Sequence, residues 1–204
     1  MKKKILKTDF FDRSAVVVAK ELVGKYLIRK IGTKVEKYKI VETEAYEGFR
    51  DKASHASYGK TLRNNPMFEK PGTIYVYFTY GMHWMLNIVC GKKGHPAAVL
   101  IRGIDDCSGP ARLTKKLEIN KNLNAKMLGK KTGLWIEKSI PSDISLKLKN
   151  KNKQIEDISS KLKIIKTPRI GVDSAGPVWS KKLYRFVLES EKEKLLKKEN
   201  RISK

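Results

Sequence analysis

Hydrophobic periodicity divides the chain into short segments that predict a mixed α/β domain. Apolar positions at helical spacing predict a helix running to Leu22, with Asp12 or Ser14 as its N-cap and Gly24 just past its end. A second helix is predicted to begin at Ser108-Gly109-Pro110. Runs of strand-forming residues predict strands at 26–29, 35–46, 73–79, 84–90, 97–102, 134–137 and 184–188, and a pair of short strands within 163–172, followed by a loop at 171–179.

The predicted strand at 35–46 has an unusual face. Alternation with a period of two puts Glu42, Glu44 and Tyr46 on one side of the strand, opposite its aliphatic residues. Glutamate is depleted in strands and is rarely fully buried without a partner. Two readings follow: a half-exposed strand with solvated glutamates, or a strand that holds a carboxylate for chemistry.

The strands at 73–79 and 84–90 predict a β-hairpin whose loop is Tyr80-Gly81-Met82-His83. Tyr75, Tyr77 and Thr79 share one face of the first strand. The tip carries large side chains in place of the small polar residues that loops prefer. Tyr80 is therefore either a packing plug or a wedge that enters between stacked bases.

A polar residue also lies inside the second strand of this hairpin. Asn87 follows Leu86 and precedes Ile88. A buried amide without a partner costs about 1–3 kcal/mol. The pattern therefore predicts either a structural hydrogen bond or a polar contact inside a pocket.

Charge points to a polyanionic partner. The 204 residues contain 45 Lys plus Arg against 21 Asp plus Glu, which gives a formal net charge of +24. Such a field attracts nucleic acid first and an anionic membrane surface second. Lys60 and Arg63 lie in a basic loop at 59–71 that suits phosphate contacts but also reads as an ordinary solvated loop. Residues 142–163 are predicted to be a lysine-rich surface insertion, and residues 189–204 a charged tail.

Several classes of protein are disfavoured. Two cysteines argue against a disulfide-stapled fold and against a cysteine zinc site, and the spacing of the three histidines fits no common metal motif. The basic N-terminus is not followed by the apolar segment of a signal peptide. We find no internal repeat and no second domain boundary, so we expect one domain over residues 1–204. The expected location is cytoplasmic and nucleoid-associated, or nuclear in a eukaryote, and not secreted.

These features together suit an enzyme that removes a base from DNA. Because a duplex hides its bases, such an enzyme must extrude a nucleotide and hold it against aromatic rings. Tyrosine faces also attract a cationic alkylated purine, by about 0.5–2 kcal/mol. A carboxylate can then deprotonate water and stabilise the oxocarbenium-like sugar. This chemistry requires no metal, flavin or nucleotide cofactor.

Five sequence runs resemble one family. They are V-E-T-E-A-Y, R-N-N-P-M-F, K-P-G-T-I-Y-V-Y-F-T-Y-G-M-H-W-M-L-N-I, G-P-A-R-L and R-I-G-V-D-S-A-G-P. In this order they closely resemble the alkyladenine (3-methyladenine) DNA glycosylases of the single-domain mammalian type, which also occur in bacteria. The resemblance extends from Asp9 to Leu188. It implies a single α/β (α+β) domain on a curved antiparallel sheet, with a protruding hairpin that enters the minor groove.

The resemblance also implies roles for individual residues. Glu44 matches the general base that activates water, while Tyr46, His55 and Tyr77 match the rings around the extruded base. Asn87 matches the amide that rejects guanine by clashing with its exocyclic amino group. The expected DNA contacts are Tyr80, which fills the gap in the duplex, with Met82 beside it, Arg102 near the flipped nucleotide's backbone, and Lys60 and Arg63 in the basic loop.

The chain departs from the family pattern in three places, and other functions stay open. His83 and Trp84 follow the hairpin tip, the insertion at 142–163 is long, and Pro177-Val178 interrupts the last run. A non-catalytic nucleic-acid binder that uses the hairpin rings as a stacking platform is the main alternative. A glycosylase fold directed at RNA or a free nucleoside, and a lysine-dependent lyase, are two more. The lesion preference also stays open, and we expect a monomer acting on duplex DNA.

Overall fold

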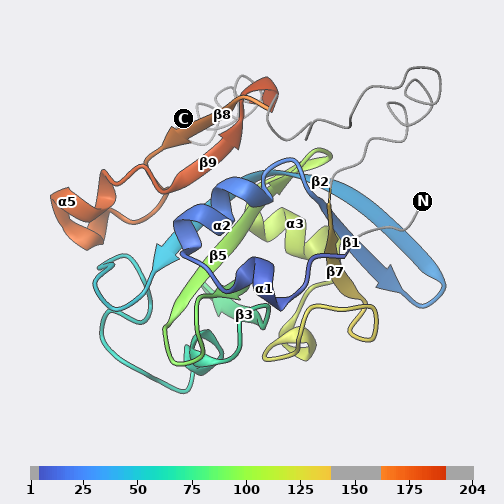
Figure 1. Ribbon diagram of the computed structural model, residues 1–204, viewed down its shortest axis with the longest axis horizontal. Helices are drawn as coiled ribbons and strands as arrows, with labels where there is room; N and C mark the ends of the chain where they lie inside the picture. The colour runs from blue at the N-terminus through green and yellow to red at the C-terminus, as the bar shows by residue number, and fades with distance from the viewer. Residues whose placement is uncertain (1–4, 139–161, 192–204) are drawn as a thin grey trace.

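The computed structural model describes residues 5–138 and 162–191 (Figure 1). Its helices are α1 Thr8–Phe11, α2 Ala15–Leu22, α3 Pro110–Lys116 and α5 Gly176–Ser180, with 3-10 turns at 65–68, 121–123, 173–175 and 189–191. Its strands are β1 Tyr26–Ile31, β2 Lys34–Glu47, β3 Ile74–Thr79, β4 His83–Cys90, β5 Ala97–Ile104, β6 Cys107–Ser108, β7 Leu134–Glu137, β8 Ile164–Thr167 and β9 Arg185–Leu188.

In this part of the chain the strands form one curled antiparallel sheet in the order β3-β4-β5-β2-β1-β7, with β6, β8 and β9 joined at its sides (Figure 1). The fold class expected from the sequence is confirmed: a mixed α/β domain built on a curved antiparallel sheet. No helix in the described residues is long and apolar enough to cross a membrane.

One face of the sheet packs in the main hydrophobic core, and the other face lines a cavity. Alternating residues such as Val41, Val76, Ile88 and Ile101 pack with α2 and α3 in the main hydrophobic core. The intervening positions of β2, β3, β4 and β5 point away from that core and line a cavity. The same alternation that builds the core therefore gathers the polar and aromatic side chains on the other face.

β2 is the central strand of this arrangement. Its first half pairs with β1, while its second half lies between β5 and β9. Both backbone edges are therefore occupied at Glu42 and Glu44, whose exposed fractions are 2% and 0%. The reading of this stretch as half-exposed with solvated glutamates is wrong, because arginine side chains, the Tyr46 hydroxyl and the Ile170 N–H cover and hydrogen-bond the two carboxylates.

The first predicted helix is confirmed with the expected ends. The Ser14 side chain accepts a hydrogen bond from the Val16 N–H at 3.2 Å, and Gly24 follows the helix with φ +86°. The Ser14 hydroxyl also donates to Glu47 at 2.7 Å. α2 is thereby attached to the end of β2, the strand that carries both buried glutamates.

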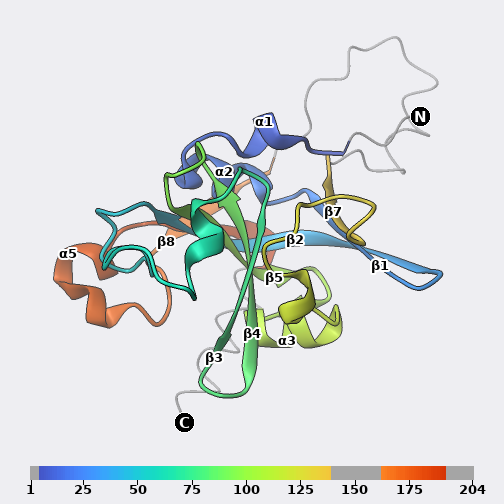
Figure 2. The ribbon, with the colours of Figure 1, turned by 90° about the horizontal axis from the view of Figure 1, so that it is seen from below.

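The hairpin β3–β4 projects from the body of the domain (Figure 2). Its loop has three residues, one fewer than expected, because Thr79 pairs with His83. Tyr80 and Gly81 have φ of +51° and +66°, and the Met82 N–H donates to the Thr79 carbonyl oxygen at 3.1 Å. This is the pattern of a type I′ turn, whose twist matches that of paired strands. It places Tyr80 at the tip.

Two expectations for the C-terminal third are wrong. Only β8 forms within 163–172, because the backbone after it turns towards the interior, where the Ile170 N–H donates to the Glu44 carboxylate. The predicted loop near Pro177 contains the short helix α5, whose first turn tolerates a proline that lacks an N–H. β5 also continues two residues beyond Arg102. The predicted insertion, apart from its last two residues, and the tail beyond residue 191 lie outside the described residues.

One close approach inside the sheet yields a testable prediction. Gly103 is paired with Glu42, and an added Cβ would lie 3.1 Å from the Glu42 Cβ and 3.2 Å from its Oε2. We expect Gly103→Ala to lower the free energy of unfolding by about 1–3 kcal/mol through overpacking, measured by urea denaturation.

Gly129→Ala is the matched control, because nothing lies within 4 Å of its added Cβ. It should change stability by less than about 0.5 kcal/mol. Equal effects of the two substitutions would contradict the packing argument.

Candidate active site

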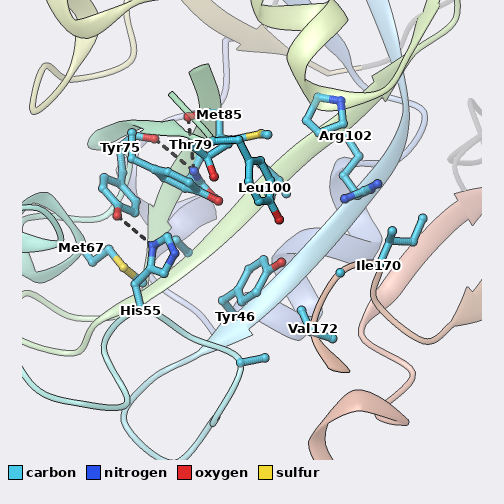
Figure 3. Close-up of a pocket in the computed structure, with 17 residues that line it drawn as sticks. Tyr46, His55, Met67, Tyr75, Thr79, Met85, Leu100, Arg102, Ile170 and Val172 are labelled. Atoms are coloured by element: carbon cyan, nitrogen blue, oxygen red, sulfur yellow. Dashed lines mark hydrogen bonds between the residues drawn. The ribbon is translucent and has the colours of Figure 1, made fainter. Parts of the chain in front are cut away.

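A cavity of about 320 Å³ opens on the sheet face opposite the main core (Figure 3). In Figure 3, His55 and Tyr75 lie on one side of it, Arg102 and Ile170 on the other, and Tyr46 between them. The lining comes from four strands, three loops, the 3-10 turn at 65–68 and the start of α3: Tyr46, Ala53, His55, Met67, Tyr75, Tyr77, Thr79, Tyr80, Met85, Asn87, Ala98, Leu100, Arg102, Pro110, Ile170, Gly171 and Val172.

Glu44 lies directly behind one wall of this cavity. Its Oε2 accepts hydrogen bonds from the Tyr46 hydroxyl at 2.9 Å and from Arg102 Nη1 at 3.4 Å. Its Oε1 accepts from the Ile170 N–H at 2.8 Å. All three partners line the cavity. The carboxylate is therefore one side chain away from whatever occupies that space.

A second buried carboxylate orients Arg102. Glu42 Oε1 accepts from Arg102 Nε at 2.9 Å and from Arg185 Nε at 2.7 Å. Burial alone would lower the pKa of Arg102, but the adjacent Glu44 and Glu42 outweigh burial and raise it. Arg102 is thus a permanent cation, fixed between two acids at the cavity wall. Its exposed fraction is only 13%, so any DNA contact by Arg102 would be made inside the cavity.

Tyr46, Tyr75 and Tyr77 stay neutral at pH 7. Burial raises the pKa of Tyr77 to about 12, and raises that of Tyr75 as well. Burial, reinforced by the neighbouring Glu44, raises the pKa of Tyr46 well above its ordinary value. Neutral phenol rings keep the electron-rich faces that stack on bases and attract cations.

His55 completes the ring cluster. Its Nδ1 lies 3.0 Å from the Tyr75 hydroxyl, and its ring meets the Tyr77 ring edge to face with centroids 4.6 Å apart. The side chain is accessible at the surface, yet the rings around it displace much of the water that would solvate an imidazolium. Burial, and then the charge of Arg63, lower the pKa of His55 below 6.5. His55 is therefore neutral at pH 7.

Asn87 has both features that the sequence left open. Its exposed fraction is 3%, and its Nδ2 donates to the Tyr75 carbonyl oxygen at 3.2 Å. The same side chain lines the cavity. A hydrogen bond to the hairpin backbone thus fixes the amide at the cavity surface.

The other expected DNA contacts lie at the hairpin tip and in the basic loop beside it. Tyr80 and Met82 are 80% and 66% exposed at the hairpin tip, so Tyr80 is not a packing plug. Arg63 donates to the Phe78 carbonyl oxygen at 2.9 Å, and its guanidinium lies 5.1 Å from the centre of the Tyr77 ring. The Lys60 ammonium lies 5.3 Å from the centre of the Phe68 ring. The basic loop therefore borders the cavity beside the hairpin.

One buried ion pair was not anticipated from the sequence. Arg169 and Asp51 have fully buried side chains, and both terminal nitrogens of Arg169 donate to the Asp51 carboxylate. The guanidinium also donates to the Ala45 carbonyl oxygen at 2.8 Å and lies 4.9 Å from the centre of the Tyr46 ring. The pair ties the 170–172 segment of the cavity wall to the loop that carries His55. In the sequence, the only indication of this pair was the charged residue Arg169 at the start of the run R-I-G-V-D-S-A-G-P.

Metal-ligand clusters are not found in residues 5–138 and 162–191: no group of three His, Cys, Asp or Glu side chains there could hold a metal ion. Two of the departures from the family pattern lie outside the cavity. His83 and Trp84 line a separate groove. Pro177-Val178 lies in the first turn of α5.

Comparison with known proteins identifies the family. The family model described as Methylpurine-DNA glycosylase (MPG) matches residues 9–107 and 104–192, nearly the whole chain. The chain belongs to this family. The family resemblance noted in the sequence is thereby confirmed.

Three curated relatives match this chain over most of its length and most of their own. A protein of Methanocella arvoryzae is 38% identical over a match of 192 aligned positions, which covers 84% of this chain and 86% of the relative. One from Legionella pneumophila strain Corby is 36% identical over 191 residues, 90% and 94% of the two chains. One from Carboxydothermus hydrogenoformans is 37% identical over a match of 207 aligned positions, which covers 92% of this chain and 97% of the relative. Each is named "Putative 3-methyladenine DNA glycosylase".

The buried ion pair of this methylpurine-DNA glycosylase family member leads to a prediction about stability. Asp51→Asn keeps the shape of the side chain but leaves the Arg169 guanidinium uncompensated in the interior. We expect it to lower the free energy of unfolding by about 3–5 kcal/mol, measured by urea denaturation.

A surface pair provides the control. Arg13 and Glu21 also form an ion pair, but their side chains are 36% and 44% exposed. Glu21→Gln should therefore cost less than about 1 kcal/mol. A loss no larger for Asp51→Asn than for Glu21→Gln would refute the structural role of the buried pair.

A second prediction concerns the charge of His55. Because the folded protein holds this imidazole less readily protonated than the unfolded chain, the free energy of unfolding should fall as pH drops below 6.5 through the lowered pKa. Arg63→Ala should raise the pKa of His55, since a repelling charge is removed, but burial should keep it below 6.5. NMR titration of the imidazole signals measures the pKa of His55 in the wild type and in the variant, and urea denaturation at a series of pH values measures the free energy of unfolding.

Lys60→Ala is the matched control, since Lys60 is a neighbouring cation that is not among the causes of the His55 shift. An equal response to both substitutions would show that His55 senses the overall positive field and not Arg63.

Proposed function

We propose that this protein is a DNA repair glycosylase that flips an alkylated or deaminated purine out of duplex DNA and hydrolyses its N-glycosidic bond. The observation that carries the proposal is Glu44, a buried carboxylate whose three hydrogen-bond partners all line a ring-walled cavity. The names of the curated relatives and the family match support the same activity.

The extruded base would occupy the space bounded by Tyr46, His55 and Tyr77. Base-aromatic stacking contributes about 1–3 kcal/mol per base, which offsets part of the cost of unstacking. Neutral tyrosine faces favour a purine that carries a positive charge, as one alkylated on a ring nitrogen does. A neutral His55 adds a hydrogen-bonding edge without repelling that charge.

Asn87 would act as the selective element. Its amide is fixed by the Tyr75 carbonyl oxygen and cannot swing aside without losing that hydrogen bond. A purine with a 2-amino group would have to displace it. This rejects normal guanine while admitting purines that lack the group.

Glu44 would serve as the general base. A carboxylate offers about four acceptor positions, and three are occupied by Tyr46, Arg102 and the Ile170 N–H. The fourth would hold the attacking water, which has to reach it from the cavity past Tyr46 or Arg102, because Glu44 itself is fully buried behind them. As the water oxygen bonds to C1′, its proton passes to Glu44, and the electrons of the glycosidic bond leave with the base, which neutralises a cationic lesion. The product is an abasic site.

Tyr80 would fill the gap that the extruded nucleotide leaves. Its 80% exposure and its place at the tip of a projecting hairpin suit a wedge that enters from the minor groove (Figure 2). The positive field of the chain would draw the protein to duplex DNA. We expect a monomer to be sufficient, since all of the proposed site residues come from one chain.

Glu44→Gln tests the mechanism. The substitution keeps the size of the side chain but removes the proton acceptor, so base release from duplexes carrying 3-methyladenine, hypoxanthine or etheno-adenine should fall by about 10²–10⁴-fold. Binding to the same duplexes should change little. A gel assay of strand cleavage at the abasic product, with wild type alongside, measures the release.

Two outcomes would overturn the proposal. Undiminished turnover by Glu44→Gln would remove the carboxylate from the mechanism. Wild-type protein that binds each duplex but releases no base would instead favour a stacking platform without catalysis.

A further inference from the structure

A second groove, of about 390 Å³, lies between the hairpin and α3. Met82, His83 and Trp84 line it from the hairpin, and Ala111, Arg112, Thr114 and Lys115 from the helix. The Thr114 hydroxyl lies 2.8 Å from the Trp84 carbonyl oxygen, which holds α3 against β4. The groove is therefore part of the rigid body of the domain at the base of the projecting tip.

The groove and the base cavity lie on opposite faces of the hairpin and adjoin at the start of α3, where Pro110 lines the base cavity and Ala111 the groove. Tyr77 and Met85 face the base cavity, whereas Trp84 pairs with Phe78 on the other face. Their rings are 4.6 Å apart. In Figure 2, α3 lies on one side of the hairpin and the segment that contains α5 on the other. The tip thus separates two binding surfaces.

The charge on this second flank is positive and uncompensated. Arg112 and Lys115 are exposed and lie three residues apart, so they share one face of α3. In the described residues neither has an ion-pair partner, and no acidic side chain lines the groove. Lys116, the next residue, is different: it pairs with Asp106 at 2.7 Å and does not line the groove.

A wedge in the minor groove has one sugar-phosphate backbone on each side. If the damaged strand delivers its base to the cavity on one flank, the complementary strand must pass the other flank. We infer that the groove between α3 and the hairpin binds the backbone of the undamaged strand, with Arg112 and Lys115 contacting its phosphates. This inference rests on the proposed function, because it assumes that the hairpin enters a duplex.

The inference predicts a loss of affinity for duplex DNA alone. The double substitution Arg112→Ala with Lys115→Ala should weaken binding to a duplex containing a tetrahydrofuran abasic-site analogue by roughly ten-fold. The slope of log affinity against log salt concentration should become shallower by the amount expected for the loss of about two phosphate contacts. Binding to the same tetrahydrofuran strand without its complement should stay within about two-fold of wild type. Fluorescence anisotropy over a salt series measures all three.

Lys20→Ala with Lys130→Ala is the matched control. It removes the same charge from exposed positions that line neither cavity. Lys20 is on α2, which lies away from the hairpin tip (Figure 2). This control should bind duplex and single strand like wild type. The charge-retaining pair Arg112→Lys with Lys115→Arg should restore most of the duplex affinity.

Three outcomes would overturn the assignment: equal weakening for single strand and duplex, an unchanged duplex affinity, or the same loss in the control. The comparison does not depend on catalysis. If the wild type releases no base and the double variant still loses affinity for duplex DNA alone, the proposed hydrolysis is refuted and the groove assignment stands.

Discussion

The structure depends on the pairing of two buried carboxylates with two arginines on the central strand. Glu42 and Glu44 lie on β2, which is paired on both edges, and their carboxylates are covered by the groups that hydrogen-bond to them. A buried charge in that position is costly unless it is paired and hydrogen-bonded. Arg102 from β5 and Arg185 from β9 supply the pairing. One strand can therefore carry acidic groups through the interior to the back of a cavity.

The hydrogen-bond network around Glu44 fixes the position of its carboxylate. Arg102 is held by Glu42 through its Nε, which leaves Nη1 to contact Glu44. The Ile170 N–H fixes the other oxygen of Glu44. The segment that supplies this N–H is itself anchored by Arg169 on Asp51. A proton acceptor is useful only when its geometry is set in advance, and here Arg102 of β5 and the anchored 169–170 segment set the position of Glu44.

Much of this was predictable because it depends on local pattern. Period-two alternation predicted that Tyr75 and Tyr77 share one face of their strand, and both rings line the cavity; helix spacing with an N-cap serine predicted α2. The hairpin followed from two strand patterns around a glycine. The exposure of the glutamates did not follow, since whether a strand is central depends on β9, which lies about 140 residues further along the chain. The Arg169–Asp51 ion pair and the absence of a second strand after β8 were not predicted either, because both depend on contacts with distant parts of the chain.

By itself, the sequence determined which side chains could share a face and which chemistry they could perform, because backbone geometry imposes those periods on any chain. Only the tertiary structure decided which acids lose water, which cations neutralise them, and that α3 lies beside the hairpin to make a second positive groove. Burial and long-range pairing are properties of segments brought together from distant parts of the chain. No local pattern records them, because the free energy that fixes them arises only when the sheet has closed around its centre.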